Sequence, residues 1–158
     1  MKKSILISIT QLNRAIYDAQ NNLCRAGLWY EFLDDIRTPK DCMEHIGDPR
    51  YINLKWVIVR SHDEFIQTLV SKHESGEFPG LVSFDHDLHD EHYHPSMYKG
   101  VHAYENAYKA FEHPTGRRSA EFLVQFCNEK HVQMPECIIH TMNPAGKVRI
   151  KSTINKEK

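Results

Sequence analysis

The sequence predicts one α/β domain built on a mainly parallel sheet of four to five strands. The chain has 158 residues, which suits a single domain, and 41% of them are hydrophobic, which is enough for a real core. Short apolar runs alternate with helical patterns at the length of β-α-β units. This alternation implies parallel strands that are joined by helices.

The first 27 residues are expected to form an N-terminal extension. Residues 4–9 are a short apolar run and a candidate additional strand. Residues 11–26 carry apolar side chains at helical spacing, and Gly27 follows them as a stop signal. The main domain is expected to span residues 28–156.

Four apolar runs in the main domain predict its strands. They are residues 28–33, 55–60, 80–84 and 136–140. Residues 36–52, between the first two runs, contain two prolines and a glycine. We expect this connection to be a loop with one helical turn.

Three helices are expected to cover the sheet. The first follows Ser61, with Glu64 three residues later as in a capping box, and ends near Gly76. The second opens at Thr115–Gly116, and the third opens at Asn143–Pro144, with proline in its first turn. A long polar insertion at about residues 89–114 separates the third strand from the second helix. Part of residues 101–111 is expected to be helical.

The overall charge excludes some functions. Twenty basic and 21 acidic side chains give a net charge of −1, which argues against a nucleic-acid coat protein. The four cysteines form no C-x-x-C pair and are interpreted as reduced thiols. No stretch approaches the ~20 apolar residues that span a bilayer. We expect a soluble cytoplasmic protein with no membrane partner.

Polar clusters follow three of the predicted strands. They are Asp34–Asp35, the run Asp85–His86–Asp87, and His140–Thr141. Parallel sheets bind ligands outside the carboxyl ends of their strands. Three clusters that are distant in the chain are therefore expected to converge on one edge of the sheet.

The acids in these clusters are candidate metal ligands. Asp34, Asp35 and Asp85 would repel one another unless a proton or a metal neutralises them. Their oxygens suit Mg²⁺ or Mn²⁺, which are the expected cofactors. The alternative is that the aspartate pair caps the next turn or helix.

The histidines in these clusters are candidate proton carriers. His86 and His140 can act as general acid or base near neutral pH, and Asp87 is grouped with them as a catalytic candidate. The alternatives are a solvated loop for the run around His86 and a satisfied core histidine for His140. His86 is also a candidate ligand for a softer metal.

Four further residues are candidates for binding a phosphate. Arg37 offers a bidentate clamp, unless it simply pairs with a local acid. Thr141 and Asn143 offer hydrogen bonds to phosphate oxygens, or they cap the last helix. Thr115 stands at a helix start, where backbone N–H groups attract anions; the alternative is an ordinary helix start.

Four motifs together resemble the family described as cyclic-phosphate-processing receiver domains. They are the LDD-x-R-x-P signature within Phe32–Pro39, the DHDL run of Asp85–Leu88, the Thr115–Gly116 step, and H-[ST]-x-N-P-x-G at His140–Gly146. The match extends over about residues 29–154 in order. It departs from the pattern at His89, where the family usually has glycine.

The resemblance implies a receiver-like, flavodoxin-like three-layer sandwich. By analogy with receiver domains, Asp34, Asp35 and Asp85 would hold the metal or stand beside it. The added histidines suggest hydrolysis of phosphate esters, with cyclic phosphates on nucleotides or RNA ends as substrates. An ordinary receiver has a lysine at the end of a fifth strand, and too little chain follows His140 for that strand and a full helix. Phospho-aspartate signalling is therefore not expected.

The leading hypothesis is a metal-dependent phosphoesterase acting on cyclic phosphate esters of nucleotides or RNA ends. The attacking group is then either water or Asp85 itself. The alternative is a non-enzymatic, metal-dependent module that binds a cyclic nucleotide or a protein. A phosphatase of the haloacid dehalogenase type would use the D-x-D in Phe84–Asp87, but the Gly-Thr step and late acidic pair are missing. The last alternative is a structural receiver whose acids cap turns.

Overall fold

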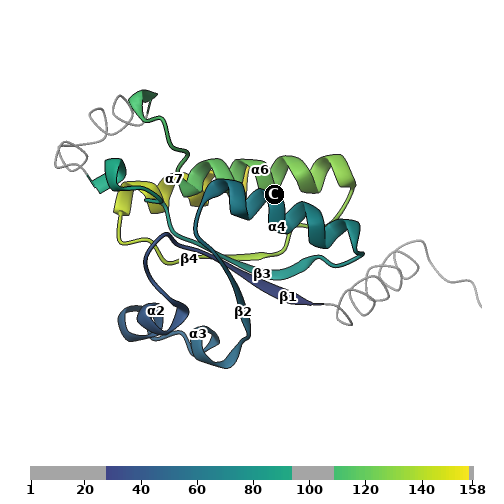
Figure 1. Cartoon of the computed structure of the whole chain (residues 1–158), viewed down its shortest axis with the longest axis horizontal. Coiled ribbons are helices and arrows are strands. Elements are labelled where there is room, and N and C mark those ends of the chain that lie inside the picture. Colours follow the sequence, from purple (N-terminus) through teal and green to yellow (C-terminus); the bar gives the residue numbers. More distant parts are fainter. Residues whose placement is uncertain (1–27, 94–108, 157–158) are drawn as a thin grey trace, which may run out of the picture.

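The computed structural model describes residues 28–93 and 109–156 as a three-layer α/β sandwich, in which α2 and α3 cover one face of the sheet and α4, α6 and α7 cover the other (Figure 1). In chain order the elements are β1 (Trp29–Leu33), α2 (Pro39–Ile46), α3 (Arg50–Asn53), β2 (Trp56–Val59), α4 (His62–Glu74), β3 (Pro79–Phe84), the 3₁₀ helix η2 (Asp90–Tyr93), α6 (Gly116–Lys130), β4 (Glu136–Ile139) and α7 (Pro144–Asn155). The predicted fold class is confirmed.

The described residues form a four-stranded, all-parallel sheet in the order β2-β1-β3-β4. Its strands end in register, so the residues that follow them lie side by side. The backbone amide of Asp34 donates to the last residue of β2, Asp85 to the last residue of β1, and His140 to the last residue of β3. The polar clusters therefore meet at one edge, as the parallel topology predicts.

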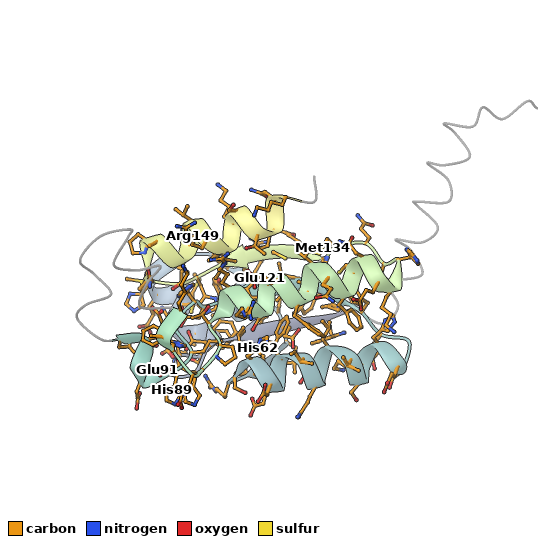
Figure 2. All side chains as sticks on the ribbon, turned by 90° about the horizontal axis from the view of Figure 1, so that it is seen from above. His62, His89, Glu91, Glu121, Met134 and Arg149 are labelled. Atoms are coloured by element: carbon orange, nitrogen blue, oxygen red, sulfur yellow. The ribbon has the colours of Figure 1, made fainter. Side chains whose placement is uncertain are left out.

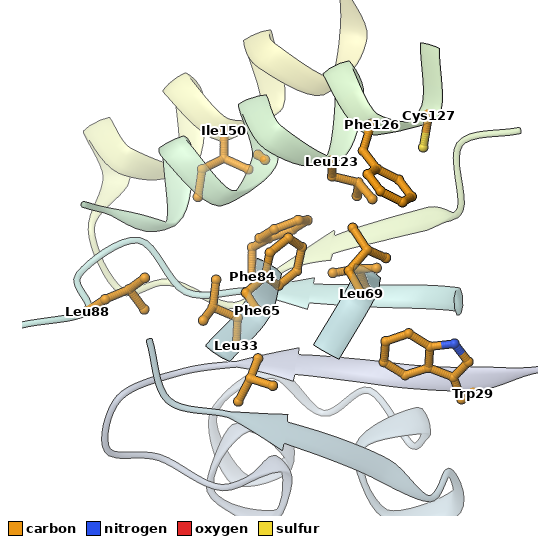
Figure 3. Packing of buried hydrophobic residues seen from close by; sticks show 13 residues of the cluster. Trp29, Leu33, Phe65, Leu69, Phe84, Leu88, Leu123, Phe126, Cys127 and Ile150 are labelled. Atoms are coloured by element: carbon orange, nitrogen blue, oxygen red, sulfur yellow. The ribbon is translucent and has the colours of Figure 1, made fainter. Parts of the chain in front are cut away.

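Side chains alternate between two cores on the two faces of the sheet. Phe84 packs with Phe65 of α4, Leu123 of α6 and Ile150 of α7 in the larger core (Figure 3). Phe32 faces the other way, into a smaller core with residues of α2 and α3. Burial of these apolar groups is the main force that holds the layers together.

Glu31 is a carboxyl group buried in the middle of β1. It lies on the strand face of Trp29 and Leu33, and neither of its carboxyl oxygens has a hydrogen-bond partner among the described residues. Burial raises the pKa of Glu31 well above its ordinary value, although the charge of Lys72 opposes this. The core therefore favours the protonated form of Glu31.

The connection between β1 and β2 differs from the prediction of a loop with one turn. It contains two helices, α2 and α3. Helix α2 begins with a reciprocal capping box, in which Thr38 and Asp41 bond each other's backbone amides and Pro39 takes the first helical position. The prolines in this connection predict a loop, whereas Pro39 starts a helix.

The start of α4 confirms half of the predicted capping box. The Ser61 hydroxyl accepts the amide of Glu64 at 3.2 Å. The Glu64 carboxylate accepts the amide of Arg60 at 2.6 Å, one residue before the cap. Ser61 is therefore the N-cap as predicted, and Glu64 braces the preceding residue.

Several predictions fall on residues that are not described. The candidate strand at 4–9, the helix at 11–26 and most of the helical part of 101–111 lie outside 28–93 and 109–156. Among the helices that are described, none has both the length and the apolar character that crossing a membrane requires.

Candidate functional site

Arg37 lies at the centre of the polar edge, between two buried aspartates. Its Nε is 2.8 Å from Asp34 Oδ2 and its Nη2 is 3.0 Å from Asp85 Oδ1. Burial and the neighbouring Asp34 charge raise the pKa of Asp85, against the opposing effect of Arg37. The guanidinium thus connects the loop after β1 to the end of β3.

Asp34 is the anchor of this arrangement. Its Oδ1 accepts the amides of Ile36 at 2.9 Å and Arg37 at 2.6 Å. Its Oδ2 accepts Arg37 Nε at 2.8 Å and faces His140 Nε2 at 3.2 Å. Burial acts to raise the pKa of Asp34, but these donors, first of all His140, lower it overall. Each carboxylate oxygen of Asp34 therefore already has two partners.

Asp35 is the more open carboxylate of the pair. Its Oδ1 accepts the hydroxyl of Tyr93 at 3.1 Å, and the same hydroxyl lies 3.1 Å from the backbone oxygen of Asp87. Burial raises the pKa of Asp35 to about 6, and the charges of Asp34 and Asp85 add to this despite the Tyr93 hydrogen bond. An added cation beside Asp35 would therefore favour its ionised form.

The carboxylates suit a hard divalent cation. Oxygens of Asp34, Asp35 and Asp85 lie within 4.8 Å of one another. When all three are ionised, they and Arg37 carry two net negative charges, which one divalent ion would neutralise. Because the oxygens of Asp34 are already engaged, Asp35 and Asp85 are the better-placed ligands, and Asp34 suits a supporting role.

His140 is buried within a chain of hydrogen bonds. Its Nε2 faces Asp34, its Nδ1 is 2.6 Å from Ser83 Oγ, and Ser83 Oγ is 3.0 Å from the Tyr51 hydroxyl. The ring also stacks on Phe32 at 4.5 Å between centroids. In the neutral ring Nε2 donates to the carboxylate and Nδ1 accepts from Ser83, because a carboxylate can only accept. Both nitrogens are thus engaged in holding Asp34.

His86 lies against the start of α7 and is oriented by Asp87. Its Nδ1 is 2.9 Å from Asp87 Oδ1, and Asn143 Nδ2 donates to Asp87 Oδ2 at 3.1 Å. Asn143 Oδ1 also accepts the amide of Gly146 at 2.9 Å. A Cβ on Gly146 would stand 2.3 Å from Cγ of His86, so only glycine lets the helix pack on this ring.

A pocket of about 600 Å³ opens beside His86 and the start of α6. Thr115 lines it as the N-cap residue of α6, and its side chain makes no capping hydrogen bond. Arg117 and Arg118 also line it, and both pair with Glu121. Its remaining lining residues are Lys109, Phe111, Glu112, His113 and Pro114. The pocket thus joins two predicted site residues, His86 and Thr115, with basic side chains.

The comparison with protein families decides the classification. Residues 30–156 match the model of the cyclic-phosphate processing receiver domain. The chain belongs to this family. The comparisons with curated proteins and with solved structures found no match. The family's description indicates involvement in cyclic-phosphate processing and a partner that carries phosphate.

The structure brings the predicted site residues of this receiver domain together in two groups. One contains Asp34, Asp35, Asp85, Arg37, His140 and Thr141, and the other contains His86, Asp87, Asn143 and Thr115. Thr141 hydrogen-bonds to Asp85 and its Oγ1 accepts the amide of Asn143 at 3.2 Å. Thr141 and Asn143 therefore hold acids, in addition to any contact with phosphate.

Sequence reasoning missed three residues of this receiver domain. Arg60 donates through Nη1 to the backbone oxygens of Asp34 at 2.9 Å and Arg37 at 2.6 Å, which holds their loop in place. Ser83 orients His140, and Tyr93 contacts Asp35. The sequence did contain a signal for Arg60, because this residue directly follows β2 in the same way that Asp34 follows β1.

Proposed function

We propose that this receiver domain hydrolyses cyclic phosphate esters of nucleotides or RNA ends with the help of Mg²⁺ or Mn²⁺. The observation that carries the proposal is the grouping of Asp34, Asp35 and Asp85 around Arg37 at the carboxyl edge of the sheet. It combines oxygen ligands for a divalent cation with a guanidinium for a phosphate.

Each residue at the carboxylate centre has a separate task in this proposal. Asp35 and Asp85 would hold the cation, while Asp34 keeps Arg37 in position through its Nε and backbone amide. The cation, when bound, would polarise a phosphoryl oxygen and promote ionisation of the attacking water. Arg37 is partly exposed and would bind a non-bridging phosphate oxygen as charge accumulates on it.

Proton transfer is better suited to His86 than to His140. Asp87 contacts Nδ1 of His86 and sets the orientation of the ring, as a carboxylate does for a general base. The proton would move at Nε2, on the ring that lines the pocket beside Thr115. His140 has both nitrogens bonded to Ser83 and Asp34, which suits a positioning residue.

The test is hydrolysis of 2′,3′-cyclic, 3′,5′-cyclic and noncyclic phosphate esters with Mg²⁺, with Mn²⁺ or with EDTA. Wild type should turn over a cyclic ester only with metal. Asp85→Asn should lower kcat by about 100-fold or more, because it removes one of the two carboxylates that would hold the cation. Glu44→Gln removes an exposed charge on α2 and should leave turnover unchanged.

A metal-dependent binding module is the second candidate. Arg37 lies beside the carboxylates, so a bound cation and the guanidinium would together hold a phosphate group. Such a site would capture a phosphate ligand without cleaving it. Ligand binding that requires metal, with no turnover of any ester, would favour this candidate and contradict the first.

A further inference from the structure

A second cluster of metal-binding side chains lies away from the carboxylate centre. It contains His89 and Glu91, which lie near each other at one end of the domain (Figure 2), and His113, which precedes α6. One candidate ligand atom from each of the three lies within 4.8 Å of the other two. The rings of His89 and His113 are stacked, with centroids 3.6 Å apart and planes 4° from parallel.

Hydrogen bonds hold Glu91 and His113 in this arrangement. Glu91 Oε1 accepts the backbone amide of His113 at 2.8 Å and faces its Nδ1 at 3.0 Å. Because a carboxylate only accepts, Nδ1 of the neutral ring carries the proton. A metal ion bound between Oε1 and Nδ1 would take the place of this proton, so that Glu91 and His113 would both be ligands.

His92 supports the cluster without belonging to it. It is fully buried, its Nδ1 accepts the amide of Leu88 at 2.9 Å, and its Nε2 faces the backbone oxygen of His113 at 3.0 Å. Nε2 therefore donates to His113. His92 thus positions the backbone of one cluster residue.

We propose that His89, Glu91 and His113 bind a transition-metal ion of the Zn²⁺ class, at a site separate from the carboxylate centre. Two imidazoles and one carboxylate are the ligand types that Zn²⁺, Co²⁺ and Ni²⁺ prefer, whereas an all-oxygen set favours Mg²⁺ or Mn²⁺. Residues 89–91 and 113 flank the segment 94–108 in the sequence. A bound ion would therefore connect the two ends of the insertion, at the wall of the pocket that His113 lines.

The site can be tested with metal alone, independently of catalysis. Full-length protein without a purification tag is titrated with Co²⁺ in excess Mg²⁺, and the visible absorption of bound Co²⁺ is recorded. Zn²⁺ is then added to displace it. His89→Gln, Glu91→Gln and His113→Gln should each weaken Co²⁺ binding by about tenfold or more. His45→Gln is the matched control, because His45 is an exposed histidine at the end of α2.

Asp85→Asn separates this site from the carboxylate centre and should keep the Co²⁺ absorption at full strength. His89→Gln provides a second check should the His113 substitution disturb the fold, because it leaves both hydrogen bonds between Glu91 and His113 in place. Equal Co²⁺ affinity in wild type and His89→Gln would overturn the proposal. So would a loss of Co²⁺ absorption in Asp85→Asn as large as that in the cluster variants.

Discussion

Arg37 Nη2 lies 3.0 Å from Asp85 Oδ1, although 48 positions separate the two residues in the chain. Asp85 is almost fully buried, so its ion pair with the guanidinium is a main source of stabilisation for the buried carboxylate. The same guanidinium bonds Asp34 through Nε. This one side chain therefore links two neighbouring strand ends and supplies the positive charge of the site.

Removal of Arg37 should destabilise the domain. Arg37→Ala would leave Asp34 and Asp85 as buried carboxylates without their cation, and we expect a loss of about 2–4 kcal/mol. Arg37→Lys should recover less than half of this, because an ammonium cannot bond both acids in the same fork. Urea unfolding in EDTA at pH 7 measures the free energy. A loss below about 0.5 kcal/mol for Arg37→Ala would show that the acids do not need the guanidinium.

Glu31 should make the stability of the domain depend on pH. The pKa of Glu31 is higher in the folded protein than in the unfolded chain. The stabilising contribution of the protonated group is fully present below the unfolded pKa. The free energy of unfolding then falls as pH rises from the unfolded pKa toward the folded pKa. Glu31→Gln removes the titration while keeping the shape. From pH 4.5 to pH 8, the free energy of unfolding of the variant should rise by about 1 kcal/mol or more relative to that of wild type. If urea unfolding shows a difference between variant and wild type that stays constant across this range, the raised pKa of Glu31 is refuted.

Gly146 should be intolerant of even one added methyl group. The Cβ of Gly146→Ala would meet the His86 ring, which Asp87 holds in place through Nδ1. We expect a loss of about 1–3 kcal/mol in thermal unfolding, and lower activity from displacement of the ring. Gly80→Ala is the control, since its Cβ meets the end of the flexible Leu28 side chain. Similar losses in the two variants would contradict the proposed packing on His86.

The two histidines should respond differently to substitution. His86→Gln should lower kcat/KM by about 100-fold or more, because it removes the group that would move the proton. Ser83→Ala removes a partner of His140 and should lower kcat/KM by about tenfold or less. Initial rates of cyclic ester hydrolysis with Mn²⁺ separate the cases. A larger loss in Ser83→Ala than in His86→Gln would reverse the two assignments.

The sequence allowed the strands and the edge of the sheet to be predicted because both depend on local patterns. Apolar runs that end in Asp34, Asp85 and His140 place these residues once the strands are parallel. The partners within the site were not predictable in this way. His140 and Asp34 are 106 positions apart, and the alignment of their atoms depends on how the strands are paired.

The helices between β1 and β2 show a different kind of error. Proline is both a loop signal and a good first residue of a helix. The Thr38–Asp41 capping box was visible in the sequence and would have favoured a helix at Pro39. The weight given to proline alone, without the residues on either side of it, led to the wrong prediction.

The most direct test of the proposed activity is the rate of 2′,3′-cyclic nucleotide hydrolysis with Mn²⁺, compared between wild type and Asp35→Asn. Asp35 is the more open carboxylate, so its substitution perturbs the packing less than that of Asp34 or Asp85. We predict metal-dependent turnover by wild type, none in EDTA, and a loss of about 100-fold or more in the variant. Equal rates in Mn²⁺ and EDTA, or an Asp35→Asn enzyme as active as wild type, would contradict hydrolysis at the carboxylate centre.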